Sequence, residues 1–180
     1  MDGPDCRETF ITGGMLSSLD AGGVRTASLN EEGVFPLSLG GLWELIHAHL
    51  DERRLSEIHP RFVSGRSIRE GQAIEYAGRS FPREKVAERT IRVGGRPRRT
   101  TWNYRIEPPI RYDYDFTFPN GSLMRFENRY SAAQGGTLVK TAAEISLKRV
   151  PSFLALRIVR RSLERSDRED LDFAKRLGLH

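Results

Sequence analysis

Two side chains in this sequence have the type and position expected of acid–base groups. His59 stands directly before Pro60, where a helix is expected to give way to a strand, and an imidazole can take or give a proton near neutral pH. Glu75 lies in the strand-rich region that follows. Each has a structural alternative: His59 as a turn histidine bonded to the backbone, and Glu75 as a solvated strand residue. Both are therefore weak candidates for proton transfer.

Four charged residues of this region, Glu75, Arg79, Glu88 and Arg89, could form an acid–base pair or a carboxylate clamp inside a cavity. Successive side chains along a strand point to opposite faces of the sheet. Because the pattern does not settle the strand register of residues 71–94, the same alternation can equally place these groups in water. We expect the four side chains to face solvent.

Motifs for metal binding and for nucleophilic catalysis are absent from the sequence. His47 and His49 are two residues apart on an expected helix, so they point to different faces and cannot share one metal ion. Cys6 is the single cysteine, and the sequence has neither a G-x-S-x-G motif nor a phosphate-binding loop. We expect no metal site and no cofactor.

The composition predicts one domain. The chain has 180 residues, of which 38% are hydrophobic and 29% charged, so it can form a core. No apolar stretch approaches the ~20 residues of a membrane helix, so we expect no integral membrane segment. Residues 1–23 are rich in glycine and lack periodic hydrophobicity; we expect a poorly ordered leader there and a single domain over residues 24–180. The first residues carry no secretory signal, so we expect a cytoplasmic protein.

Two short helices are expected after a first strand near Val34. Ser38 can cap the first helix, because its hydroxyl can accept a backbone N–H of the first turn, and an apolar stripe at helical spacing follows over residues 39–50. The second helix covers residues 51–58 and ends before Pro60. Each helix has an apolar side that must pack on another element.

The middle of the chain has the pattern of an antiparallel meander. Turn dipeptides recur about one strand length apart, at residues 94–95, 108–109, 120–121 and 135–136. Asn120-Gly121 is the strongest of them, because a tight hairpin needs positive φ at both central positions. Between the turns, apolar and polar residues alternate, so four strands share one apolar face and one charged face. The apolar face carries Trp102, Tyr104, Ile110, Tyr112, Tyr114, Phe116, Phe126 and Tyr130.

A long C-terminal helix is expected to cover this apolar face. Pro151 and Ser152 can open it, and no proline or glycine follows before Gly178, which predicts about 26 residues. At 1.5 Å per residue such a helix is ~39 Å long, enough to cross a sheet whose ten-residue strands span ~33 Å. Its apolar stripe is interrupted by a polar gap at Ser166, Asp167 and Asp170.

Several stretches carry this order of elements: LWELIHAHL (42–50), EIHPRFVSGRSIREG (57–71), WNYRIEPP (102–109), GTLVKTAAEISLKRVPSFL (136–154) and EDLDFAKRLG (169–178). Over about residues 34–177 the chain resembles the START-related helix-grip superfamily, also called SRPBCC, which includes polyketide cyclase/dehydrase-like and lipid-transfer proteins. It looks most similar to uncharacterised prokaryotic single-domain members. The resemblance implies an α+β fold in which a curved antiparallel sheet of six to eight strands grips the C-terminal helix. Only Gly65 and Gly71 follow the second helix, so the dense glycine loop of plant-type members is missing and phosphate binding there is doubtful.

The resemblance also implies a cavity between sheet and helix, and the aromatic face points the same way. A cavity with mostly apolar walls and few polar groups is typical of a small-molecule site. The alternative is that the aromatic residues form an ordinary core, and Asn128 is either a ligand contact or bonded to a neighbouring strand. The residues expected to bind a ligand are Trp102, Tyr104, Tyr112, Tyr114, Phe116, Phe126, Asn128, Tyr130 and Thr141 on the sheet, with Phe153 and Leu156 on the helix.

The expected function is binding or transport of a small hydrophobic or amphipathic molecule, such as a lipid, an isoprenoid, a quinone or a polyketide-like aromatic. The alternative is an enzyme of the cyclase or dehydratase type that uses the same cavity, with His59 or Glu75 as its acid–base group. Basic residues gather at 92–99 and on the C-terminal helix, but acidic residues accompany them on the helix and the net charge is only +5. We therefore expect the partner to be a small hydrophobic molecule and not nucleic acid. We expect the protein to be a monomer or a homodimer.

Overall fold

The computed structural model of the chain describes the backbone of residues 17–19, 25–148 and 152–180, and the side chains of residues 26–148 and 154–180. The elements within these ranges, in chain order, are β1 (Ser17–Leu19), β2 (Arg25–Phe35), α1 (Leu39–Leu50), α2 (Leu55–Ile58), β3 (Phe62–Glu70), β4 (Ala73–Tyr76), β5 (Arg79–Pro82), β6 (Glu84–Val93), β7 (Arg96–Glu107), β8 (Arg111–Thr117), β9 (Leu123–Ala133), β10 (Gly136–Ser146) and α3 (Ser152–Arg176). None of the described helices combines the length and the apolar character needed to cross a membrane.

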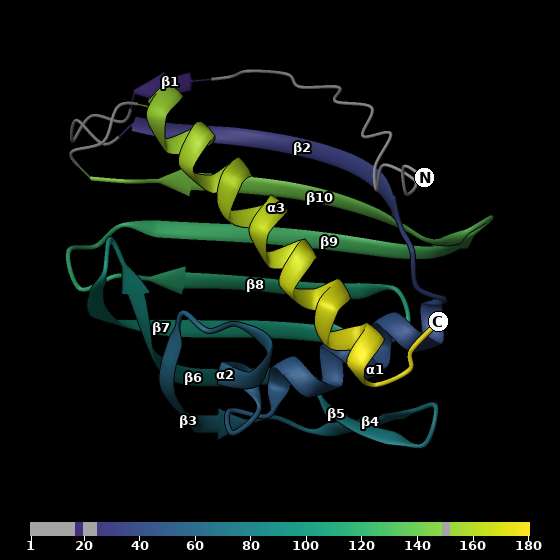
Figure 1. Ribbon diagram of the computed structural model, residues 1–180. Helices are drawn as coiled ribbons and strands as arrows, with labels where there is room; N and C mark the ends of the chain where they lie inside the picture. Colours follow the sequence, from purple (N-terminus) through teal and green to yellow (C-terminus); the bar gives the residue numbers. More distant parts are fainter. Residues whose placement is uncertain (1–16, 20–24, 149–151) are drawn as a thin grey trace.

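Eight of the strands form one antiparallel sheet in the order β1-β2-β10-β9-β8-β7-β6-β3, and β4 and β5 form a separate hairpin. Helix α3 crosses the sheet diagonally, and its C-terminal end lies beside α1 (Figure 1). The predicted α+β architecture, with a long helix across a curved sheet and two short helices after the first long strand, is confirmed. Of the residues expected to form a leader, 17–19 pair with β2, while 1–16 and 20–23 lie outside the described residues.

The meander from β6 to β10 follows the predicted turns. Gly94-Gly95, Asn120-Gly121 and Gly135-Gly136 connect successive antiparallel strands, and the glycines there adopt positive φ. On β7, every second residue from Thr100 to Ile106 is buried, as the alternation predicts. Ile110 is an exception: it was expected on the apolar face but is 50% exposed, because it lies in the turn between β7 and β8 and its N–H donates to the carbonyl of Glu107.

The β4–β5 hairpin leaves the sheet and packs on α1. Trp43 of α1 anchors it, with its ring centroid 5.4 Å from that of Phe81 and 6.0 Å from that of Tyr76. The indole Nε1 of Trp43 also donates to the carbonyl of Pro109 at 2.9 Å. Trp43 and Phe81 are each only 1% exposed, so a group of buried hydrophobic side chains also forms between α1 and this hairpin. Residues 73–82 therefore form a separate hairpin, while β6 pairs with β7 in a regular register.

Helix α3 is packed against the rest of the fold at both ends of its buried stripe. Ala155 and Val159 are buried near its start, and Phe173 and Ala174 near its end. Between them, Arg61 reaches up from the connection between α2 and β3 and donates to the hydroxyls of two serines of α3. Its Nη1 lies 2.8 Å from Ser162 Oγ, and its Nη2 bonds Ser166 Oγ. The middle of α3 is thus held by a long charged side chain, which leaves space beneath it.

Candidate ligand-binding cavity

The space between α3 and the sheet consists of two adjoining lobes. The first, of about 180 Å³, lies under the C-terminal half of α3 beside α1 and α2 and carries several ionisable groups; we call it the polar lobe. The second, of about 280 Å³, lies under the N-terminal half and is called the apolar lobe. The residues that line both lobes, and therefore mark their junction, are Arg61, Phe62, Trp102, Tyr114, Leu163 and Ser166.

Most of the residues expected to bind a ligand line these lobes. Those on the walls of the polar lobe are Trp102, Tyr104, Tyr112, Tyr114, Asn128, Tyr130 and Thr141. Phe116 and Phe126 line the apolar lobe instead. Leu156 lines neither lobe and packs against the core, and the side chain of Phe153 lies outside the described residues. The cavity is therefore bounded mainly by the aromatic face of the sheet.

The aromatic rings form a continuous layer on the cavity floor. The ring centroids of Trp102 and Phe116 are 4.2 Å apart, and those of Tyr114 and Phe126 are 4.9 Å apart, both pairs stacked. Burial raises the pKa of the tyrosines in the layer, so their phenols are neutral and can both donate and accept hydrogen bonds. The tyrosines with raised pKa are Tyr104, Tyr112, Tyr114 and Tyr130. The floor thus combines apolar area with neutral hydroxyls.

Asn128 is held by the neighbouring strands. Its Nδ2 donates to the carbonyl of Tyr112 at 2.7 Å on β8, and its Oδ1 accepts from the hydroxyl of Thr141 at 2.8 Å on β10. Its backbone N–H donates to Asp113 Oδ1 at 3.1 Å. Of the two interpretations that the sequence left open, the geometry favours the bond to neighbouring strands, because both ends of the amide already have protein partners.

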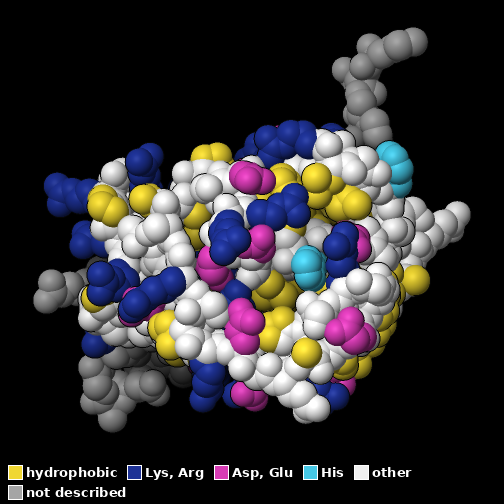
Figure 2. All heavy atoms as spheres, turned by 90° about the horizontal axis from the view of Figure 1, so that it is seen from below, with side chains coloured by type: hydrophobic (Ala, Val, Ile, Leu, Met, Phe, Trp, Pro, Cys, Tyr) yellow, Lys and Arg dark blue, Asp and Glu magenta, His cyan; other side chains and the backbone are white. Residues whose placement is uncertain are grey.

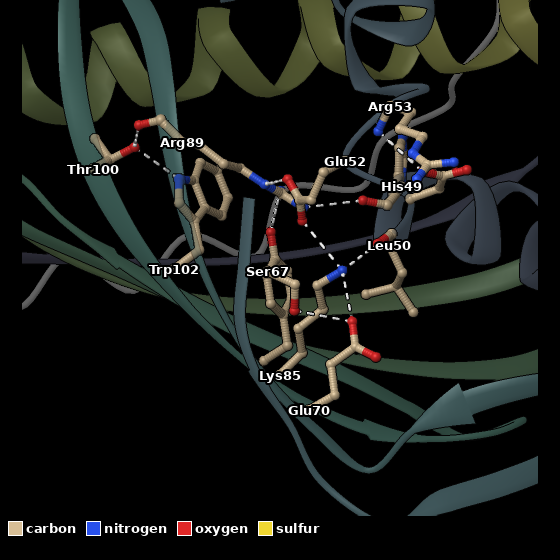
Figure 3. A network of polar contacts seen from close by, with 12 residues as sticks. His49, Leu50, Glu52, Arg53, Ser67, Glu70, Lys85, Arg89, Thr100 and Trp102 are labelled. Carbon is tan, nitrogen blue, oxygen red and sulfur yellow. Dashed lines mark hydrogen bonds and ion pairs between the residues drawn. The ribbon is translucent and has the colours of Figure 1, made fainter. Parts of the chain in front are cut away.

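A buried ionic network lies beside the polar lobe. On β6, Lys85 and Arg89 point inward to Glu52, which follows α1 (Figure 3). Arg89 is 3% exposed, and its Nη2 lies 2.7 Å from Glu52 Oε1 and 3.1 Å from the carbonyl of His49. Its Nη1 bonds the hydroxyl of Tyr104. The expectation that Arg89 faces solvent was therefore wrong, because Glu52 supplies a counter-charge inside the fold.

The other three charged candidates lie away from the cavity. Glu75 is exposed on β4. Arg79 pairs with Glu44 on the surface, its Nη2 3.1 Å from Glu44 Oε2. Glu88 pairs with the exposed Arg66 at 2.7 Å. Glu75 thus lies outside both lobes and is no longer a candidate for proton transfer there.

His59 lies in the polar lobe and contacts two carboxylates of α3. Its Nδ1 is 2.7 Å from Glu169 Oε2, and its Nε2 is 3.3 Å from Asp170 Oδ1. The same Asp170 oxygen is 2.9 Å from Nε2 of His49, whose ring stacks on that of His59 at 5.2 Å. Burial lowers the pKa of His59 to about 3 in spite of the neighbouring Asp170, so its imidazole is neutral at pH 7. The alternative, a turn histidine whose ring is hydrogen-bonded to the backbone, does not apply, because the partners of the ring are side-chain carboxylates.

Figure 2 views the molecule from the edge that carries β3, α2 and the β4–β5 hairpin. Side chains of both charge signs and a histidine surround a recessed patch of hydrophobic side chains in the middle of this face. Sequence reasoning named His59 as a candidate but did not place His49, Glu169 and Asp170 beside it. The available signal was the polar gap in the apolar stripe of α3, which includes Asp170 and lies against the polar lobe.

No protein-family model and no curated protein sequence matches this chain. Solved structures do match. Ara h 8.0201 aligns with a TM-score of 0.61 at 16% identity, covering 83% of this chain and 97% of its own. The Zhui aromatase/cyclase from Streptomyces sp. R1128 aligns with a TM-score of 0.58 at 15% identity, covering 83% of this chain and 91% of its own. The chain has the helix-grip fold.

The di-domain ARO/CYC StfQ from the steffimycin biosynthetic pathway has the same helix-grip architecture over 85% of this chain, with a TM-score of 0.61 at 11% identity. The match covers 52% of StfQ, so this chain corresponds to about half of that two-domain protein. The resemblance to the helix-grip superfamily that the motifs indicated is thus confirmed at the level of the fold. At these identities the shared property is architecture, because proteins with one fold carry out many different functions.

Proposed function

We propose that this helix-grip domain binds a small amphipathic molecule, such as a lipid, an isoprenoid, a quinone or a polyketide-like aromatic, across both lobes of the cavity. The observation that carries the proposal is the junction of the lobes: six residues line both. Each lobe alone, at about 180 and 280 Å³, is smaller than the ~300 Å³ at which small-molecule sites usually begin. A ligand would therefore extend from one lobe into the other beneath Leu163.

The two ends of the cavity fit different parts of such a molecule. The apolar lobe is lined by Phe116, Phe126 and Met124, which suit a hydrocarbon or aromatic portion. The polar lobe offers phenol hydroxyls and the guanidinium of Arg61 for a hydroxyl, carbonyl or carboxylate group. Burial of ~300 Å² of apolar ligand surface contributes roughly 7 kcal/mol at 25 cal/mol per Å². Association costs of at least ~4 kcal/mol then leave at most about 3 kcal/mol, which is a Kd in the millimolar range, so tighter binding requires the polar groups to contribute.

Leu163 gives the sharpest test because it lines both lobes. We expect the fluorescent probe 8-anilinonaphthalene-1-sulfonate, an aromatic anion, to bind the full chain, and Leu163→Trp to weaken its Kd at least ~10-fold by filling the junction. Leu154→Trp is the matched control, because Leu154 lies on the same helix, is 39% exposed and lines neither lobe. Equal probe binding by the two variants would contradict the proposal. Native mass spectrometry and solvent extraction of freshly purified protein would then identify a natural ligand.

A second candidate is an enzyme of the cyclase or dehydratase type that uses the same cavity. The observation that favours it is the gathering of ionisable groups at one end of the cavity, where His59, Asp170 and Arg61 all line the polar lobe. Such a reaction moves protons on a bound poly-β-ketone and needs groups of this kind within reach. A linear poly-β-keto thioester should give dehydrated cyclic product faster with the wild-type protein than with Asp170→Asn. Product formation no faster than without protein would exclude this candidate.

A further inference from the structure

Two histidines and one carboxylate from three helical segments meet at the wall of the polar lobe. His49 comes from α1, His59 follows α2, and Asp170 comes from α3. Asp170 Oδ1 lies 2.9 Å from His49 Nε2 and 3.3 Å from His59 Nε2, and one ligand atom from each of the three residues lies within 4.8 Å of the others. Ligand atoms bound at 2.0–2.2 Å around one tetrahedral Zn²⁺ are about 3.3 Å apart. The distances from Asp170 Oδ1 to the two histidine nitrogens are therefore close to the spacing that a shared metal ion requires, while the two nitrogens, which lie within 4.8 Å of each other, would move closer on binding.

The hydrogen bonding of His59 places a nitrogen lone pair beside a carboxylate oxygen at this point. Its Nδ1 faces the Glu169 carboxylate at 2.7 Å, and because a carboxylate accepts, Nδ1 carries the proton. In the neutral ring Nε2 then holds a bare lone pair, which faces the Asp170 oxygen, itself an acceptor. Asp170 Oδ1 already has His49 Nε2 as a partner at 2.9 Å, so a cation there would give His59 Nε2 a partner and would replace the hydrogen bond between His49 and Asp170.

Glu169 fits the role of a residue that orients a metal ligand. Metal-bound histidines usually donate their second ring N–H to a carboxylate, which sets the tautomer and the ring orientation. Glu169 does this for His59, while stacking on His49 and contact with Phe62 at 5.6 Å hold the ring from the sides. His59 is 6% exposed. Its ligand atom is thus positioned in advance, so little ordering is needed on binding.

The local charge suits a divalent cation. Asp167, Glu169 and Asp170 bring three carboxylates to this part of α3, and the positive charges of Arg61 and Arg165 offset part of them. Arg89 lies nearby, but Glu52 pairs with it directly. His49, His59 and Asp170 all line the polar lobe, so an ion held by them would keep an open coordination position toward the cavity. Three protein ligands with one open position are typical of catalytic rather than structural metal sites.

We propose that His49, His59 and Asp170 bind a divalent transition-metal ion, Zn²⁺ or Fe²⁺, with Glu169 as the residue that orients His59. This inference departs from the sequence-based expectation of no metal site, which compared His47 with His49 on one helix and could not include residues from α3. It goes beyond the proposed binding of an amphipathic molecule and does not depend on it. With the ion bound, His59 Nε2 would be a ligand and could no longer take a proton from a substrate.

Calorimetric titration of the chelator-treated full chain with Zn²⁺ alone tests the site. We expect one ion per chain, a loss of affinity of ~100-fold for His49→Gln and for Asp170→Asn, and a 10- to 100-fold loss for Glu169→Gln. His47→Gln is the matched control, because His47 lies on α1 outside the cluster and should leave the affinity unchanged. Absence of Zn²⁺ binding by the wild-type chain, or equal loss in His47→Gln, would overturn the proposal.

A measurement on the wild-type chain covers the case in which the variants do not fold. X-ray absorption of the Zn²⁺-loaded protein should contain two imidazole ligands and at least one oxygen ligand. A spectrum with one imidazole or none would place the ion elsewhere and overturn the site. Because no organic probe is present, either result is independent of the test with Leu163→Trp.

Discussion

Arg89 and Glu52 form a two-point ion pair inside the fold, with Nε–Oε2 at 2.8 Å and Nη2–Oε1 at 2.7 Å (Figure 3). The ion pair joins β6 to the turn that follows α1. The guanidinium also lies over the rings of Trp102 and Tyr104, 5.1 Å from each centroid. Helix α1 is thus tied to the sheet by charge as well as by apolar packing. The same link supports the wall of the polar lobe, because its guanidinium bonds the backbone carbonyl of His49.

We expect Arg89→Met to lower the free energy of unfolding by about 3–5 kcal/mol, because it leaves the Glu52 carboxylate buried without its main partner. Arg66→Met is the matched control on the adjacent strand. It removes the ion pair with Glu88, in which the Arg66 side chain is 73% exposed, so the loss should be at most ~1 kcal/mol. Urea denaturation followed by circular dichroism measures both. Similar losses in the two variants would mean that the buried Arg89–Glu52 ion pair contributes no more to the free energy of unfolding than an exposed one.

Variants of Asn128 test whether this residue stabilises the cavity wall or contacts a ligand. Asn128→Ala should lower the free energy of unfolding by about 1–3 kcal/mol, because it removes the partner of the Tyr112 carbonyl. It also leaves the hydroxyl of Thr141 without its acceptor. Thr141→Val, which removes a single hydrogen bond, should cost roughly 1 kcal/mol. Probe affinity should change little in either variant; strong loss of probe binding with unchanged stability would assign Asn128 to ligand contact instead.

Gly136 cannot carry a side chain where β10 begins. Its φ is +153°, and a Cβ atom there would lie 2.1 Å from the carbonyl oxygen of Phe35 on β2. We expect Gly136→Ala to cost at least ~2 kcal/mol, since the obstacle is backbone and cannot rotate away. Gly33→Ala on β2 is the control, because nothing lies within 4 Å of the added Cβ, and its effect should stay within about 0.5 kcal/mol. Thermal unfolding of the two variants tests this, and equal midpoints would refute the clash.

Arg61 should control how firmly the middle of α3 is held. Arg61→Leu removes the donors to Ser162 and Ser166 but keeps an apolar stem of similar length. We expect faster amide hydrogen exchange in residues 158–168 of α3 and unchanged exchange in β7, because local opening depends on local contacts. Arg157→Leu, on the same helix and exposed, is the control and should leave exchange as in the wild-type chain. Uniform acceleration throughout the sheet would instead indicate global destabilisation.

Local patterns were enough to predict the architecture. The cap at Ser38, whose Oγ accepts from the N–H of Gly41 at 3.1 Å, depends on residues three apart. The hairpin at Asn120-Gly121 depends on the backbone freedom of two adjacent residues, and the buried face of β7 depends on period-two alternation. Each of these signals lies within a few residues of the structure that it specifies. The helix-grip fold follows once such elements are placed in order.

The site needed more than local pattern. Arg89 lies on the same face of β6 as the buried Ala87 and Ile91, and only Glu52, 37 residues earlier, makes the burial of its charge tolerable. Glu169 and Asp170 resemble a solvated face of a charged helix, and only the packing of α3 over α1 and α2 brings them to His49 and His59. The sequence by itself therefore determined the sheet, the covering helix and the aromatic floor, because these depend on short-range periodicity. Tertiary structure alone decided which charges are buried and which meet, because the cost of burying a charge depends on a partner that lies far away in the chain.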